Sequence, residues 1–150
     1  MKKVAIIPAR LASSRFPGKP MANMISIPMV GHCYFRTKLA LGIDDVYVAT
    51  CDDEIAEYIH SIGGKAVMTS TSHTRASTRT SEALEIIESD ISQRIEIVVM
   101  VQSDEPLIPP KAISETLQHF SDPKVEIVNI MSQLRNLKSF KDNNNVKVVM

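Results

Sequence analysis

Short apolar runs alternate with amphipathic segments along most of this chain, and that alternation constrains its fold more than any other feature. Apolar runs typical of strands lie at 4–7, 45–50, 65–68, 95–102, 125–131 and 146–150. Segments of helical character lie between them, at 28–42, 52–64, 79–91 and from Pro109 onward. Strands that alternate with helices predict an α/β fold, with a mostly parallel sheet and helices on both faces. The run at 95–102 is the most apolar, which predicts a central strand buried on both sides.

The bulk composition excludes several classes of protein. With 150 residues, the chain is long enough for one domain with a substantial core. Its 17 basic and 17 acidic residues balance, so no overall field favours nucleic acid or an anionic membrane, and any anion site is local. Cys33 and Cys51 form no CxxC or zinc pattern, which favours a reduced, cytoplasmic protein. The N-terminal apolar run, closed by Pro8, is too short for a signal peptide or a membrane span.

Three polar segments follow predicted strands, at the end of an open α/β sheet where ligands bind. The first, PARLASSRFPGK, carries Arg10, Arg15 and Lys19. Two guanidinium forks and one mobile ammonium suit a triphosphate. The loop has neither the P-loop spacing nor a dinucleotide-binding glycine pattern. The alternative is a solvated basic loop whose arginines cap carbonyl groups.

The second segment, VQSDEP, offers a candidate metal ligand. If strand geometry persists, Gln102 and Asp104 project on the same side. Mg²⁺ takes one or two carboxylates and fills its other positions with water and phosphate oxygens, a role that Asp104 could serve. The alternative is a turn in which Asp104 only caps backbone amides.

The third segment, TSTSHTRASTR, holds His73, Arg75 and Arg79. Arg79 lies near a predicted helix start, where free amides favour an anion. A single histidine such as His73 is more often a surface or supporting residue than a catalyst. The sequence has no Cys/His cluster that suggests zinc and no legible Ser-His-Asp arrangement.

These motifs resemble those of the sugar-activating cytidylyltransferases. IIPARLASSRFPGKPM, VYVATCDDEIAEYIHSIGGKAVMTS, HTRASTRTSEAL and VQSDEPLIPP occur in the order and spacing of that family. The resemblance covers essentially the whole chain and is strongest to the 3-deoxy-manno-octulosonate cytidylyltransferases of lipopolysaccharide assembly. It implies a nucleotide-diphospho-sugar transferase (Rossmann-like) fold. It also implies that CTP and a 3-deoxy-2-keto sugar acid give a CMP-sugar and pyrophosphate.

The resemblance also assigns roles to residues. It implies nucleotide binding by the basic loop and by a glutamine, Mg²⁺ binding by an aspartate, and substrate binding by the middle loop. The nucleotide set is Arg10, Ser13, Arg15, Lys19 and Gln102; the metal ligand is Asp104; the substrate set is His73, Arg75 and Arg79. Lys19, Arg15 and Asp104 are the predicted catalytic residues, since they would align the triphosphate and neutralise its charge.

Departures from the family pattern keep other functions open. Arg75-Ala76 stands where the family has Ser-Gly, Thr78 where it has an acid, and Ser103 where it has a glycine. The substrate could therefore be another acidic sugar, of the sialic-acid or amino-octulosonate type. Because family members are longer, the chain could also bind nucleotide without catalysis. Because family members are far longer, we expect residues 1–150 to be the N-terminal portion of a single nucleotidyltransferase domain, truncated at its C-terminal side. The full-length protein is then expected to be a cytoplasmic homodimer.

Overall fold

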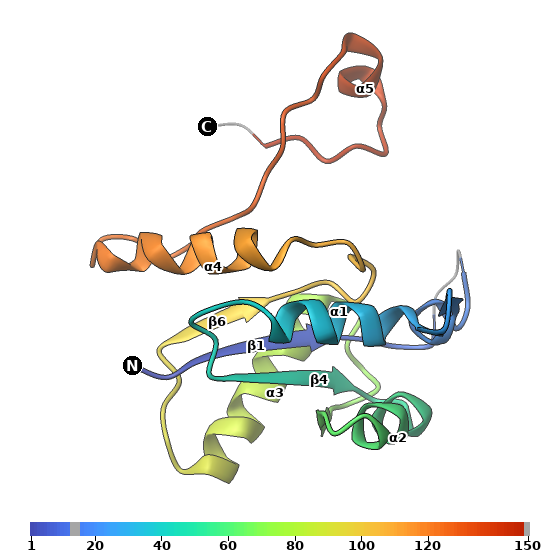
Figure 1. Cartoon of the computed structure of the whole chain (residues 1–150), viewed down its shortest axis with the longest axis vertical. Helices are drawn as coiled ribbons and strands as arrows, with labels where there is room; N and C mark the ends of the chain where they lie inside the picture. Colours follow the sequence, from blue (N-terminus) through green and yellow to red (C-terminus); the bar gives the residue numbers. More distant parts are fainter. Residues whose placement is uncertain (13–15, 149–150) are drawn as a thin grey trace. The chain divides into compact units, whose positions relative to one another are not determined.

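A parallel sheet organises residues 1–115 of the computed structural model, which describes residues 1–12 and 16–148 (Figure 1). Its strands are β1 (Lys3–Pro8), β4 (Asp45–Thr50), β5 (Lys65–Met68) and β6 (Ile97–Met100), in the order β5-β4-β1-β6. All neighbouring pairs are parallel, and Ile6 of β1 lies opposite Tyr47 on one side and Met100 on the other. The α/β fold predicted from the alternating pattern is confirmed.

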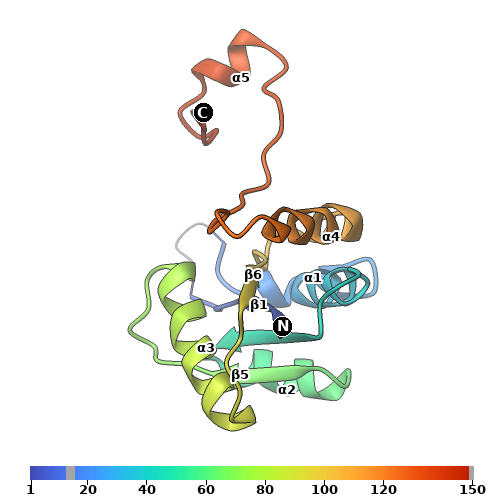
Figure 2. The same cartoon turned by 90° about the vertical axis from the view of Figure 1, so that its left-hand side faces the viewer.

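Helices cover both faces of this sheet. They are α1 (Met29–Lys38), α2 (Asp53–Ser61), α3 (Ala76–Ile91) and α4 (Pro110–Gln118). In Figure 2, α1 and α3 lie on opposite sides of the strands. This arrangement agrees with the prediction of helices on both faces. None of the helices in the described part of the chain combines the length and the apolar composition that crossing a bilayer requires.

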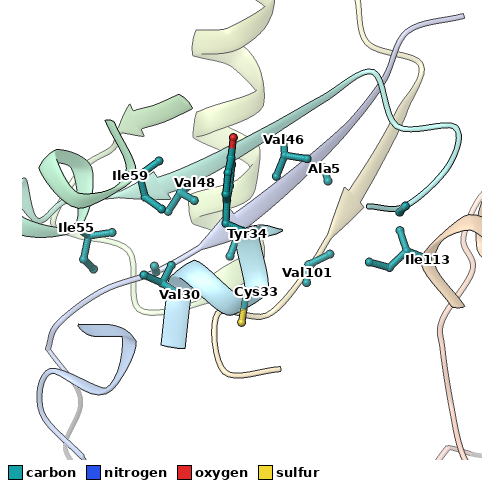
Figure 3. Packing of buried hydrophobic residues seen from close by; sticks show 13 residues of the cluster. Ala5, Val30, Cys33, Tyr34, Val46, Val48, Ile55, Ile59, Val101 and Ile113 are labelled. Carbon is teal, nitrogen blue, oxygen red and sulfur yellow. The ribbon is translucent and has the colours of Figure 1, made fainter. Parts of the chain in front are cut away.

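Two apolar cores follow from the alternation of side chains along the strands. Ala5, Val46 and Val48 point to the face that also buries Val30 of α1 and Ile55 of α2 (Figure 3). The intervening strand residues point to the other face, where the buried cluster comprises Val4, Ile6, Tyr47, Ala49, Val67, Ala83, Ile87 and Ile95. Full burial of a side chain of this size contributes roughly 1.5–3 kcal/mol. The two cores hold the strand ends, and therefore the loops that follow them, in fixed positions.

Several predicted boundaries were wrong. The helix predicted at 28–42 ends at Lys38, and that predicted at 79–91 begins at Ala76. The prediction missed short elements before α1: η1 (Lys19–Met21) and a hairpin of β2 (Asn23–Met24) and β3 (Ile27–Pro28). The run at 95–102 gives only a four-residue strand, and β6 lies at the sheet edge in the described structure, not at its centre. Apolar composition alone does not distinguish an edge strand from a central one.

Residues 116–150 form a second compact unit. Among its described residues, 116–148, the secondary structure after the end of α4 consists of η2 (His119–Ser121) and α5 (Leu137–Lys141). The strand predicted at 125–131 is absent, as is any strand at 146–148; residues 149–150 lie outside the described residues. A strand requires a partner for its backbone N–H and C=O groups, which an apolar run does not itself supply. That all 150 residues belong to one nucleotidyltransferase domain stays a prediction.

Candidate functional site

The strand order creates a switch point between β1 and β6. From β1 the chain builds outward through β4 and β5 on one side, whereas β6 pairs with the other side of β1. Ligands in open α/β sheets bind beyond the carboxyl ends of strands at such a point. The three polar segments predicted from the sequence meet there, around a cavity of about 250 Å³.

The loop after β1 contributes Arg10 and Lys19 to the cavity wall. Its two ends are joined by a hydrogen bond from the Gly18 N–H to the Leu11 carbonyl, 2.9 Å long. Gly18 has φ +72°, a conformation that glycine adopts without steric cost. Arg10 Nη1 also lies 3.5 Å from the His73 carbonyl oxygen of the third segment. The predicted nucleotide ligands Ser13 and Arg15 lie outside the described residues.

The segment after β6 brings Gln102 and Asp104 to the same cavity. The strand ends at Met100, and a hydrogen bond from the Glu105 N–H to the Gln102 carbonyl closes a turn, so the condition that strand geometry persists to Asp104 is not met. Both side chains nevertheless line the cavity, because the turn stays at the strand end. Lys19 Nζ donates to Asp104 Oδ2 over 2.8 Å, across 85 residues of sequence. The cationic loop and the candidate metal ligand therefore face each other directly.

The third segment places His73, Arg75 and Arg79 on the cavity. Because α3 begins at Ala76, three residues earlier than predicted, Arg75 is its N-cap residue and Arg79 lies one turn further on. Residues four apart share one face of a helix, which explains why both arginines reach the cavity. The N-terminal amides of the helix lie beside them, and such amides favour an anion.

Two of these side chains have partners that fix their orientation. Arg79 is only 3% exposed, and its guanidinium donates to Thr69 Oγ1 and to Cys51 Sγ, the latter over 3.4 Å. His73 Nε2 lies in close contact with a carboxylate oxygen of Glu82. The hydrogen bond from the backbone N–H of Ser70 lowers the pKa of the Glu82 carboxyl below its usual value, and the contact with His73 lowers it further. The Glu82 carboxylate therefore orients the His73 ring.

The cavity wall is strongly cationic although the whole chain is neutral. Among the described residues lining it, four have basic side chains (Arg10, Lys19, Arg75, Arg79) and one, Asp104, is acidic. In the part of the chain that the structure describes, none of the three arginines forms an ion pair. A wall of this kind binds an anion with several negative charges. This cavity is therefore a candidate for a local anion site of the kind that a balanced composition still allows.

A metal carried by such an anion fits the donor set. No group of three or more His, Cys, Asp or Glu side chains able to hold a metal occurs in the described ranges 1–12 and 16–148. Mg²⁺ needs fewer, because it takes one or two carboxylates and completes its shell with water and phosphate oxygens. Asp104 has a half-exposed side chain at the cavity wall and could provide the protein ligand.

Sequence reasoning missed the residues that support this site. Thr69 and Cys51 hold Arg79, Glu82 holds His73, and Asp52 accepts a hydrogen bond from the backbone N–H of Leu11. Cys51 and Asp52 directly follow β4, which is paired with β1, so their place at a strand end was a usable signal. Glu82 lies three residues after Arg79 on the same helix. All four lie within the family segments 46–70 and 73–84, but the sequence pattern of those segments assigns none of them a role.

Comparisons with known proteins agree with this architecture. A family model described as cytidylyltransferase matches residues 4–150. Two curated 3-deoxy-manno-octulosonate cytidylyltransferases, from Geobacter metallireducens and Geobacter sulfurreducens, are 42% and 43% identical over 99% of this chain. The chain spans 57% and 58% of their lengths.

A solved structure gives the same result at the level of the fold. The structure of CMP:2-keto-3-deoxy-manno-octonic acid synthetase complexed with CTP is similar, with a TM-score of 0.73 and 35% identity. That similarity covers 83% of this chain and 50% of the synthetase chain. The family match extends over nearly every residue, and the cavity gathers the motifs that predicted it. The chain belongs to the cytidylyltransferase family.

Proposed function

We propose that this protein transfers the cytidylyl group of CTP to an acidic 3-deoxy-2-keto sugar of the octulosonate type, releasing pyrophosphate. The observation that carries the proposal is the meeting of Arg10, Lys19 and Asp104, from two separate loops, at one cavity. The similar curated proteins carry the name of this activity, and the similar solved synthetase is described with CTP.

The charges of the cavity suit these two substrates together. Four cationic side chains against one carboxylate leave an excess of three positive charges. A magnesium-bound triphosphate and a sugar carboxylate together carry roughly three negative charges at neutral pH. Bringing two anions into one site requires such a wall, because their mutual repulsion would otherwise oppose the reaction.

In the proposed reaction, the anomeric hydroxyl of the sugar attacks the α-phosphorus of CTP, and pyrophosphate leaves from the opposite side. Such a displacement depends mainly on alignment and on neutralisation of charge. Lys19 would leave Asp104 and stabilise the departing pyrophosphate, Arg10 would hold the nucleotide beside β1, and Asp104 would hold Mg²⁺. When bound, the metal polarises the α-phosphoryl group. Arg15 is proposed to assist Lys19 on the basis of the sequence alone.

The first test replaces the two groups of the ion pair separately. We expect Asp104→Ala and Lys19→Ala each to reduce pyrophosphate release from CTP and 3-deoxy-manno-octulosonate by at least about a hundredfold, because each removes a charge that the transition state needs. Asp53→Ala and Lys111→Ala are matched controls, since both residues are exposed and lie away from the cavity. Unchanged rates in the Asp104 and Lys19 variants would contradict the proposal.

A second acidic sugar is the alternative substrate, and Arg75 is the observation that favours it. Its guanidinium makes no hydrogen bond or ion pair within the described residues, although it lies at the cavity. A sugar with an additional anionic or hydrogen-bond-accepting group could use it. A panel of sugar acids tested with CTP separates the two substrates. Stabilisation by CTP and Mg²⁺ without any product would instead indicate a nucleotide-binding protein that does not catalyse transfer.

Other expectations depend on the sequence and on the family resemblance. They are a part in lipopolysaccharide assembly, a cytoplasmic location and a homodimer for the full-length protein. Each is proposed together with the activity. Size-exclusion chromatography with light scattering tests the last of them.

A further inference from the structure

Asp52 occupies a helix-capping position but does not cap its helix. It is the N-cap residue of α2, where an aspartate ordinarily accepts a hydrogen bond from a backbone N–H of the first turn. Its side chain makes no such bond. Asp52 Oδ2 instead accepts a hydrogen bond of 2.8 Å from the backbone N–H of Leu11, 41 residues earlier in the chain. The Asp52 carboxylate therefore binds the loop after β1 instead of its own helix.

Leu11 connects Asp52 to both ends of this loop. It follows Arg10 directly, and its carbonyl accepts the hydrogen bond from Gly18 that joins the two ends of the loop. The neighbouring Ala9 N–H donates to the Ala49 carbonyl at the end of β4 over 2.9 Å. Among the described residues of this loop, two hydrogen bonds attach it to the end of β4, and of these only the one to Asp52 has a charged acceptor. Bonds to a charged group are the stronger kind.

The adjacent residue, Cys51, extends this connection toward the third segment. Its thiol lies 3.7 Å from Asp52 Oδ2 as a donor and accepts from Arg79 Nη2 over 3.4 Å. A thiol has one weak donor and a weak acceptor, and this geometry uses both. Arg79 is fixed further by Thr69, whose backbone N–H donates to the Thr50 carbonyl. A continuous series of contacts therefore joins the loop of Arg10 to the arginine of α3 through two residues at the end of β4.

We propose that Asp52 and Cys51 are positioning residues that hold the loop after β1 and the start of α3 in fixed positions around the cavity. Asp52 sets the position of Arg10 and Lys19 through the backbone of Leu11, and Cys51 sets the guanidinium of Arg79. Neither residue lines the cavity. Their effect on CTP rests on the proposed function, whereas their effect on the loop does not.

The experiment compares Asp52→Ala, Asp52→Asn and the adjacent exposed control Asp53→Ala by two measurements. The first is trypsin cleavage after Arg10 in the absence of ligand, at a temperature well below the melting transition. The second is the Kd for CTP with Mg²⁺, determined by titration calorimetry. For Asp52→Ala we expect cleavage at least about tenfold faster and a Kd for CTP about tenfold higher, because a charge-assisted hydrogen bond is lost. Asp52→Asn keeps an acceptor oxygen without the charge and should recover part of both losses.

Cys51 provides an independent pair of variants. Cys51→Ala removes both contacts of the thiol, and we expect it to increase the rate of cleavage after Arg10 about threefold, since thiol contacts are weak. Cys51→Ser keeps a donor and an acceptor and should stay near the native rate. This pair also decides the question if Asp52→Ala does not fold.

The outcomes separate this proposal from the proposed function. Cleavage rates in Asp52→Ala and Cys51→Ala equal to those of Asp53→Ala would overturn the positioning role, whatever the protein binds. Cleavage equally fast in Asp52→Asn and Asp52→Ala would also overturn it, since the acceptor would then not matter. Absence of CTP binding by the native protein, together with the expected cleavage pattern, would overturn only the proposed function.

Discussion

Residues 95–100 (IEIVVM) and 125–131 (VEIVNIM) have nearly the same sequence and lie in different units of the chain. In the first, Ile97 is 6% exposed and lies opposite Lys3 of β1 as part of β6. In the second, Ile127 is 78% exposed, and the structure has no strand at 125–131. The shared Glu-Ile-Val sequence has the same intrinsic preference in both places. Pairing with β1 makes the difference, since side-chain packing and cross-strand partners dominate strand preference.

The difference extends to the candidate site. Every candidate site residue that the structure describes lies between Arg10 and Asp104, in the segments that follow β1, β5 and β6 or in the first turns of α3. A phosphate site needs side chains held within a fraction of an ångström, and buried strands provide such rigidity. Many apolar side chains of the second unit are exposed instead, among them Ile127, Ile130, Met131, Leu134, Leu137 and Phe140.

Proline substitutions at the matched positions 97 and 127 should give the largest difference in the free energy of unfolding between the two units. The Ile97 N–H donates to the Lys2 carbonyl, and proline would remove both that bond and a buried side chain. We expect Ile97→Pro to lower the free energy of unfolding by at least about 3 kcal/mol. Ile127→Pro should change it by no more than about 0.5 kcal/mol, because this residue is exposed and unpaired in the described structure. Urea unfolding monitored by circular dichroism measures both, and equal shifts would contradict the comparison.

The same contrast explains what could be predicted from the sequence. The order of the main strands and helices up to α4 was predictable because local periodicity is encoded within a few residues, although η1, β2 and β3 were missed. The convergence of Arg10, Arg79 and Asp104 was also predictable, since parallel strands place their carboxyl ends at one edge of the sheet. The absence of a strand at 125–131 was not, because pairing depends on residues elsewhere in the chain.

The supporting contacts were unpredictable for a similar reason. The hydrogen bond from Leu11 to Asp52 joins residues 41 apart, and no local pattern distinguishes it from the helix cap that Asp52 usually forms. The start of α3 was missed because Ala76, Ser77 and Thr78 read as a polar loop. Alanine is nevertheless a strong helix former, and the Thr78 hydroxyl donates to the Arg75 carbonyl within the first turn.

A substitution at the site should have an intermediate effect. Glutamine at position 79 cannot reproduce the two directions in which the guanidinium donates to Thr69 and Cys51, and it removes a buried positive charge. We expect Arg79→Gln to raise the KM for the sugar acid at least about tenfold. Arg135→Gln, an exposed arginine of the second unit, is the matched control and should leave KM unchanged. Equal KM values for the two variants would show that Arg79 does not contribute to binding of the sugar acid.

The smallest effect is expected at Asp45, which accepts hydrogen bonds from Lys2 (2.8 Å) and Lys65 (2.5 Å) at the start of β4. Burial alone would raise the pKa of the Asp45 carboxyl, but the two ammonium groups outweigh it and hold the pKa below its usual value. Because the pKa is lower in the folded state, this stabilisation is present above about pH 4 and disappears as the pH falls through the lowered value.

Asp45→Asn should therefore reduce the free energy of unfolding by up to about 1 kcal/mol at pH 7, the range of surface ion pairs. The difference from the native protein should shrink as the pH falls below 4, since the native carboxylate is then protonated and loses its attraction to the lysines. Asp122→Asn, in the second unit and without an ion pair among the described residues, should show no such pH-dependent difference. Urea midpoints measured from pH 7 to pH 2.5 test this prediction. If Asp45→Asn is still less stable than the native protein at the lowest pH, the loss of stability comes from packing around residue 45 and not from its charge.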